Sequence, residues 1–133
     1  SQDMTKDTCK GSAVYAQCVE SSGVTKASFM ECIQAIAEIS KVYTNIENRY
    51  YQVIDLRGMD LVPYTFLKAA ASILDTYKEY YLKSLICTAI IIDSNGLKSL
   101  ANKAIKELYL PVKPLRIVSN YEEAAAFGLF HGT

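Results

Sequence analysis

Residues 50–66, YYQVIDLRGMDLVPYTF, decide how the rest of this 133-residue chain is interpreted. Residues 51–56 are mostly apolar, which predicts a buried strand that stops at Arg57-Gly58. After a short loop, Pro63 marks the start of a helix, because proline is favoured at the first helical position. In an open α/β sheet, such a junction lies at the carboxyl edge, where ligands and partners dock. The stretch therefore predicts a fold class and the place of a site.

The rest of the chain repeats this alternation of strand and helix patterns. Alternating or continuous apolar runs predict strands, and stripes at spacings of three and four predict helices. Thr25 or Ser28 can cap the first helix, and Ser28-x-x-Glu31 and Asn120-x-x-Glu123 fit capping boxes. The expected fold is α/β: four successive β-α units form a mostly parallel four-stranded sheet with helices packed on it by right-handed crossovers. Strands are expected at residues 12–21, 51–56, 85–92 and within 114–119, and helices at residues 26–45, 63–83, 97–110 and 121–129.

Composition and charge exclude several classes of protein. The chain has fourteen basic and fourteen acidic residues, and it has no basic stripe that would favour nucleic acid. No apolar run reaches the roughly 18–20 residues that insertion into a membrane requires. Residues 1–11 lack the apolar centre of a signal peptide and are expected to be a flexible polar leader. Residues 12–133 are then expected to form one domain.

The four cysteines predict neither a metal site nor a catalytic site. None belongs to a CxxC pair, and the single histidine, His131, is far from all of them in the sequence. Cys18, Cys32 and Cys87 lie in apolar patterns and are expected to be small core residues, whereas Cys9 is expected to be exposed. Reduced thiols favour a cytoplasmic setting. No cofactor is expected, because the chain has neither a glycine-rich phosphate loop nor a P-loop lysine.

Four features together resemble one known family. The strand ending in Asp55-Leu56-Arg57-Gly58 is followed by an amphipathic helix, and the apolar strand at 86–92 ends at Asp93-Ser94. A helix follows at 97–108, and the sequence LRIVSNYEEAAAF at 115–127 joins a short strand to a capped, alanine-rich helix. The chain resembles the STAS domains, in particular stand-alone proteins of the sporulation anti-sigma-factor-antagonist type. The resemblance covers residues 50–129, and residues 12–45 in the order of elements only.

The resemblance implies a superhelix of four β-α units and a protein-interaction or ligand-sensing module without catalysis. In antagonist members of the family, a serine that starts the helix after this strand is phosphorylated, and this controls binding to a kinase. Here Pro63 and Tyr64 stand where the family has its Asp-Ser pair. Thr65, one residue further on, could accept a phosphate in its place.

The carboxyl edge of the expected sheet carries the candidate site. Asp55 and Asp93 both end buried strands. They could line one cleft and bind a cation or a polar ligand, or they could accept hydrogen bonds from loop amides or cap the next helix, which we favour. Two carboxylates without a histidine, a nucleophile elbow or a Cys–His pair define no catalytic residues. The expected ligand or partner surface consists of Asp55, Arg57, Gly58, Asp60, Tyr64, Thr65, Asp93 and Ser94.

Three functions compete on this basis. The first is a STAS-like regulatory or interaction module that binds a protein partner or a second copy of itself. The second is a protein that binds a small apolar ligand, a lipid or metabolite, between helices and sheet, as the small residues 69–71 and 124–126 would permit. The third is an enzyme that uses Asp55 or Asp93. The end of the second helix, with Tyr77, Tyr80 and Tyr81, and the start of the second strand, with Tyr50 and Tyr51, both fall on the amino-terminal edge of the sheet. These tyrosines are expected to cluster there, either as an interface or as core and rim residues, and His131 is expected in a loose tail.

Overall fold

A computed structural model describes residues 12–17, 25–59 and 61–132 of the chain. Four parallel strands form one sheet in the order β1-β2-β3-β4. They are β1 (Ser12–Gln17), β2 (Tyr50–Asp55), β3 (Leu85–Ile91) and β4 (Leu115–Val118). The expected fold class is confirmed, and each expected strand is present.

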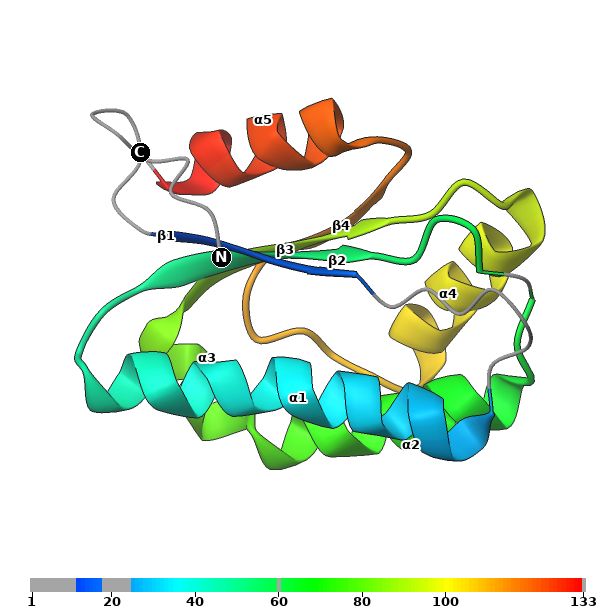
Figure 1. Ribbon diagram of the computed structural model, residues 1–133, viewed down its shortest axis with the longest axis horizontal. Helices are drawn as coiled ribbons and strands as arrows, with labels where there is room; N and C mark the ends of the chain where they lie inside the picture. The colour runs from blue at the N-terminus through cyan, green and yellow to red at the C-terminus, as the bar shows by residue number, and fades with distance from the viewer. Residues whose placement is uncertain (1–11, 18–24, 60, 133) are drawn as a thin grey trace.

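The helices lie in two unequal layers (Figure 1). The helices α1 (Lys26–Asn45), α2 (Tyr64–Thr76), α3 (Lys78–Ser84) and α4 (Asn95–Glu107) cover one face of the sheet. Each lies between two strands that are neighbours in the sheet, so successive crossovers of one hand place all of them on the same side. Only α5 (Tyr121–Gly132), which follows the last strand, covers the opposite face (Figure 1).

The start of α1 is capped by the first of its two candidate residues. Thr25 is the N-cap, its side chain accepts a hydrogen bond from the Ser28 amide, and the Ser28 side chain accepts one from the Thr25 amide. The capping box is therefore Thr25–Ser28, and the expected pairing of Ser28 with Glu31 is wrong. Serine at the third helical position can take the reciprocal role that glutamate usually has.

The single helix expected at residues 63–83 is two helices, divided at Tyr77. The Tyr77 amide bonds to the Leu74 carbonyl, and the Tyr80 amide bonds to the Tyr77 carbonyl. These bonds span three residues where an α-helix spans four, so the axis changes direction there. The Tyr77 hydroxyl also bonds to Gln34 and Glu38 on α1, which holds the break against that helix.

The last two helices also differ from their expected limits. The helix α4 begins at Asn95, because the Ser94 hydroxyl caps it by accepting a bond of 3.3 Å from the Leu97 amide. The helix α5 continues to Gly132, so the expected loose tail at His131 is wrong. The His131 ring packs edge-on against two phenylalanine rings of the same helix, Phe127 at 4.6 Å and Phe130 at 5.0 Å between centroids.

Each face of the sheet has its own core. Towards α5, the strands present Tyr51, Val53, Ile91 and Val118, which pack with Phe127. Towards the four-helix layer, apolar side chains from strands and helices form the larger core, and a second cluster lies at the amino-terminal end. In that second cluster Tyr50 and Tyr81 are buried with Tyr43 and Tyr77 beside them, so the expected tyrosine cluster is core there, whereas Tyr51 points to the other face.

The cysteines follow the expectation only in part. Cys87 is a buried thiol in the core beneath α5. Cys32 on α1 is disulfide-bonded, so the expectation of a reduced core thiol at this position is wrong. The reduced-thiol argument for a cytoplasmic setting therefore does not extend to Cys32. Cys9 and Cys18 lie outside the described residues. Within the described part of the chain, no helix has the length and apolar character needed to cross a bilayer.

Candidate functional site

A buried carboxylate lies at the carboxyl edge of the sheet. Asp55 ends β2 and is 0% exposed. Its Oδ1 accepts hydrogen bonds of 3.0 Å from both the amide and the Nε of Arg57, and its Oδ2 accepts one of 2.8 Å from Arg57 Nη2. The Tyr15 hydroxyl donates to the same Oδ2. Four donors therefore surround one carboxylate, and two of them form the bidentate fork that suits an arginine.

These donors determine the charge of the group. Burial alone would raise the pKa of Asp55, but hydrogen bonds from Arg57 and Tyr15 outweigh burial and hold the pKa below its ordinary value. The same contacts raise the pKa of Arg57, chiefly through the hydrogen bond to Asp55. Burial and the bond to Asp55 also raise the pKa of Tyr15. Near neutral pH the cluster is thus an ion pair with a protonated phenol, and Asp55 is not a free base.

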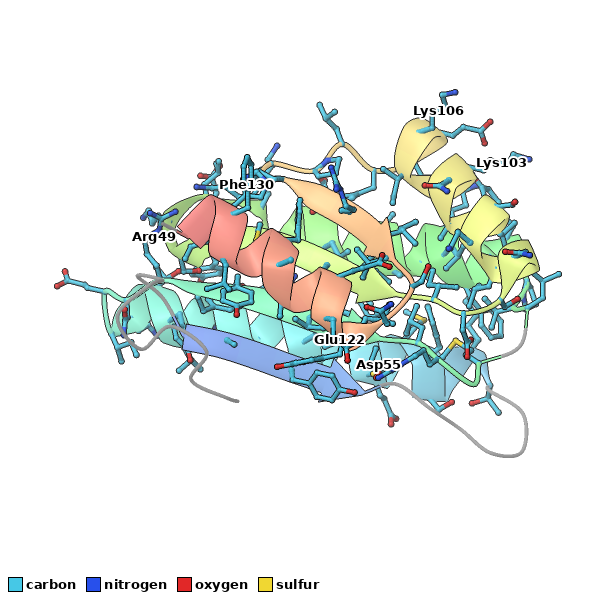
Figure 2. All side chains as sticks on the ribbon, turned by 90° about the horizontal axis from the view of Figure 1, so that it is seen from above. Arg49, Asp55, Lys103, Lys106, Glu122 and Phe130 are labelled. Carbon is cyan, nitrogen blue, oxygen red and sulfur yellow. The ribbon has the colours of Figure 1, made fainter. Side chains whose placement is uncertain are left out.

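Tyr15 and Tyr121 are the residues of this cluster that the sequence did not point to. The Tyr15 ring meets the Tyr121 ring edge-on at 5.9 Å, and Tyr121 is the first residue of α5. Figure 2 accordingly shows Asp55 beside the start of α5. The signal was available only in part: Tyr15 and Asp55 lie on the same face of adjacent strands, but their adjacency depends on strand order, which the sequence left open.

The second expected carboxylate has a different role. Asp93 is exposed, and its Oδ1 accepts a hydrogen bond of 3.4 Å from the amide of Gly58. Gly58 has a φ of 83°, a left-handed conformation that glycine adopts without the steric cost that other residues incur. Asp93 thus holds the loop after β2, and Ser94 caps α4. For Asp93, this is the structural role that we favoured.

The loop after β2 also exposes apolar surface. Leu61 is 62% exposed, and its Cδ1 lies against the backbone of Gly96 in the first turn of α4. Thr65 is exposed in the first turn of α2. Tyr64 turns away, because its hydroxyl bonds to Glu107 Oε1 at 3.0 Å and its ring lies 5.2 Å from Lys103 Nζ. Asp60 lies outside the described residues.

The structure does not bring the expected residues together as a cation site. Asp55 bonds to Arg57 and Tyr15, whereas Asp93 bonds to Gly58, so the two carboxylates serve separate donors. Among the described residues, no group of three or more His, Cys, Asp or Glu side chains could hold a metal ion. Arg57 pairs with Asp55, and Tyr64 belongs to a neighbouring contact with α4.

Other hollows lie away from this edge. One of about 440 Å³ lies on the surface of α1 and α2, lined by Met30, Glu31, Gln34, Ala35 and Ile73. A cavity of about 90 Å³ lies between the sheet and the four-helix layer, with an almost wholly apolar lining that includes Phe29, Ile54 and Ala70. A groove of about 570 Å³ runs between α5 and β4, and it is lined by Arg116, Val118, Glu123, Ala126, Phe127, Phe130 and His131.

No family model, no curated protein and no solved structure matches the chain.

Proposed function

We propose that this chain is a non-enzymatic, STAS-like interaction module that binds a protein partner through the loop after β2, the first turn of α2 and the first turn of α4. The observation that carries the proposal is the state of Asp55. Its carboxylate accepts four hydrogen bonds from within the chain, so it braces the loop and is not available for acid–base catalysis.

The surface beside the Asp55–Arg57 pair has side chains that are typical of a protein interface. Leu61 presents an exposed apolar side chain on a loop held in place by the Asp55–Arg57 pair and the Asp93–Gly58 bond. A guanidinium has five N–H donors, and Asp55 uses two of those of Arg57, whose side chain is partly exposed. A partner with an apolar side chain beside a carboxylate would match both groups.

Size argues against an apolar ligand between the sheet and the four-helix layer. The cavity beneath the four-helix layer holds about 90 Å³, whereas pockets for metabolites and drug-sized ligands measure roughly 300–1,000 Å³. An engineered apolar cavity of about 150 Å³ accepts benzene. A lipid or an ordinary metabolite held there would therefore require these helices to move apart. The groove of about 570 Å³ between α5 and β4 is large enough, but Arg116, Glu123 and His131 line it beside apolar side chains, which does not suit a purely apolar ligand. We therefore favour the interaction module.

A photo-crosslinker in place of Leu61 is expected to capture a protein partner. When p-benzoylphenylalanine replaces Leu61, irradiation in extract of the cells that encode the chain should give a discrete covalent adduct, identified by mass spectrometry. The same substitution at Leu82, which is 46% exposed on α3, is the matched control and should give no such adduct. Identical adducts from both positions, or none from either, would count against the proposed surface.

Thr65 is expected to be the phosphate acceptor if the module retains a phospho-switch. Pro63 caps α2 without a side-chain acceptor, so the first-turn amides can stabilise a phosphate on the exposed Thr65. Incubation with extract and ATP should add one phosphate by intact mass. Thr65→Ala should abolish the addition, and Thr76→Ala, at the other end of α2, should not. If the wild-type chain gains no phosphate under these conditions, a phospho-switch at Thr65 is ruled out.

A further inference from the structure

The strand β4 ends the described sheet with one side unpaired. It pairs with β3 in parallel, and no other described strand adjoins it. The amides of Thr88 and Ile92 on β3 donate to the carbonyls of Pro114 and Val118 at 2.9 and 3.0 Å. Backbone groups alternate along a strand, so the N–H and C=O groups of Leu115 and Ile117 point outward. The amide of Ser119, just beyond the strand, donates to Glu123 Oε1 at 3.2 Å. Such an edge can pair with another strand.

The segments on either side of β4 carry unusual apolar exposure. Leu110, in the loop before β4, is 89% exposed, and Phe130, on α5 after it, is 77% exposed. They are the two most exposed large apolar side chains among the described residues. Figure 2 shows Phe130 on the side of α5 that faces β4, where it borders the groove of about 570 Å³. Exposed apolar side chains beside an unpaired strand edge can become buried when that edge pairs.

We propose that two copies of this chain pair through β4, in antiparallel fashion about a twofold axis at Ile117. The outward N–H and C=O of Ile117 would bond to the same groups of the second copy. Leu115 would face Ser119 of the second copy, and Arg116 would face Val118. Two four-stranded sheets would then form one continuous sheet of eight strands. This inference concerns a different surface from the proposed function and does not rest on it.

Charge complementarity supports a second copy as the occupant. Arg116 and Glu123 both line the groove, and the Glu123 carboxylate lies beside Ser119, whose amide donates to it at 3.2 Å. A twofold axis at Ile117 brings Arg116 of each copy to the end of β4 where the other copy has Glu123. Neither side chain forms an ion pair within the described part of its own chain. The dimer would therefore contain two equivalent Arg116–Glu123 contacts between copies.

The spacing of the elements permits this pairing. The helix α5 packs mainly over β3. Two copies of β3 would be three strand spacings apart, roughly 14 Å at ~4.8 Å each. Packed helices lie about 8–10 Å apart, so the two α5 helices would not collide. The additional width leaves room above the paired strands for the side chains of Phe130 and Arg116 from both copies.

Complementary charge reversals test this dimer. In sedimentation velocity, the full chain should show a concentration-dependent dimer. Arg116→Glu alone and Glu123→Lys alone should each weaken dimerisation at least about tenfold, because each places like charges at both contacts. A one-to-one mixture of the two variants should restore the dimer, because opposite charges then meet at both contacts. Leu61→Ser, on the proposed partner surface, is the control and should dimerise as the wild type does.

Hydrogen exchange provides a second readout that needs no variant. The Ile117 amide should exchange more slowly as the concentration of the wild-type chain rises, while the amide of exposed Leu61 should not change. Circular dichroism confirms that each variant is folded. The proposal is overturned if the wild type is a monomer up to millimolar concentration, if both single variants dimerise normally, or if Ile117 exchange does not depend on concentration. A folded pair of variants that fails to dimerise on mixing would also overturn it.

Discussion

Replacing Asp55 with asparagine is expected to lower the free energy of unfolding by about 2–3 kcal/mol at pH 7, in the range of hydrogen bonds to a charged group. The asparagine side chain would keep the shape of the carboxylate but present an amide NH₂ where Arg57 and Tyr15 both donate. Arg57 would also lose its bidentate acceptor, and the Asp55 side chain itself is 0% exposed, so the oxygen is lost at a position that solvent does not reach. Urea denaturation, followed by circular dichroism, measures the difference.

The effect should depend on pH in a defined direction. The pKa of Asp55 is lowered in the folded state from an ordinary value of 3.8. The ionised carboxylate therefore contributes its full stabilisation above that value. The contribution is lost as the pH falls through 3.8 towards the lower folded-state pKa, because the unfolded chain takes up its proton first. The difference in the free energy of unfolding between the wild type and Asp55→Asn should accordingly become smaller as the pH falls below 3.8. Arg57 stays charged throughout this pH range.

Asp93→Asn is the matched control for this experiment. Asp93 is exposed and accepts one hydrogen bond, from Gly58. Its replacement should change stability by no more than about 0.5 kcal/mol, as is usual for surface substitutions. The buried ion pair does not stabilise the loop if Asp55→Asn and Asp93→Asn lower the free energy of unfolding equally. The same conclusion follows if the stability difference between the wild type and Asp55→Asn is unchanged at low pH.

Gly128→Ala is expected to destabilise the chain by about 2–3 kcal/mol, the cost of overpacking a filled core. A Cβ at position 128 would lie 2.2, 2.5 and 2.6 Å from three atoms of the Tyr51 ring. Tyr51 is 0% exposed beneath α5, so its ring has no space to move into. This cost must exceed the gain of about 1 kcal/mol that alanine normally brings over glycine inside a helix.

Gly96→Ala separates the clash from helix propensity. Gly96 is also helical, but a Cβ there would meet Leu61 Cδ1 at 3.7 Å and Ser94 Oγ at 3.9 Å, which is ordinary contact. This variant should be neutral or more stable than the wild type by up to about 1 kcal/mol. Thermal or urea unfolding of both variants shows whether the clash with Tyr51 outweighs the gain in helix propensity. If Gly128→Ala proved as stable as Gly96→Ala, the close packing of α5 on Tyr51 would be wrong.

The candidate site was predictable in its parts but not in its connections. Asp55, Arg57 and Gly58 were visible because a buried strand ends at a glycine turn, and the positive φ of Gly58 follows from local chemistry. The partners of Asp55 were not visible. Arg57 turns back to Asp55 through a local contact, but Tyr15 meets Asp55 only because β1 lies next to β2.

Local patterns alone determined the alternation of strands and helices, the parallel sheet and the position of the loop after β2, because periodicity and turn residues act within a few positions of the chain. Tertiary structure decided what depends on distant contacts. The break at Tyr77 reflects bonds to Gln34 and Glu38 on α1, and the extension of α5 to Gly132 accompanies packing of that helix on the sheet. The unpaired edge of β4 likewise exists only because the strands assemble in the order β1-β2-β3-β4, which no local stretch of sequence encodes.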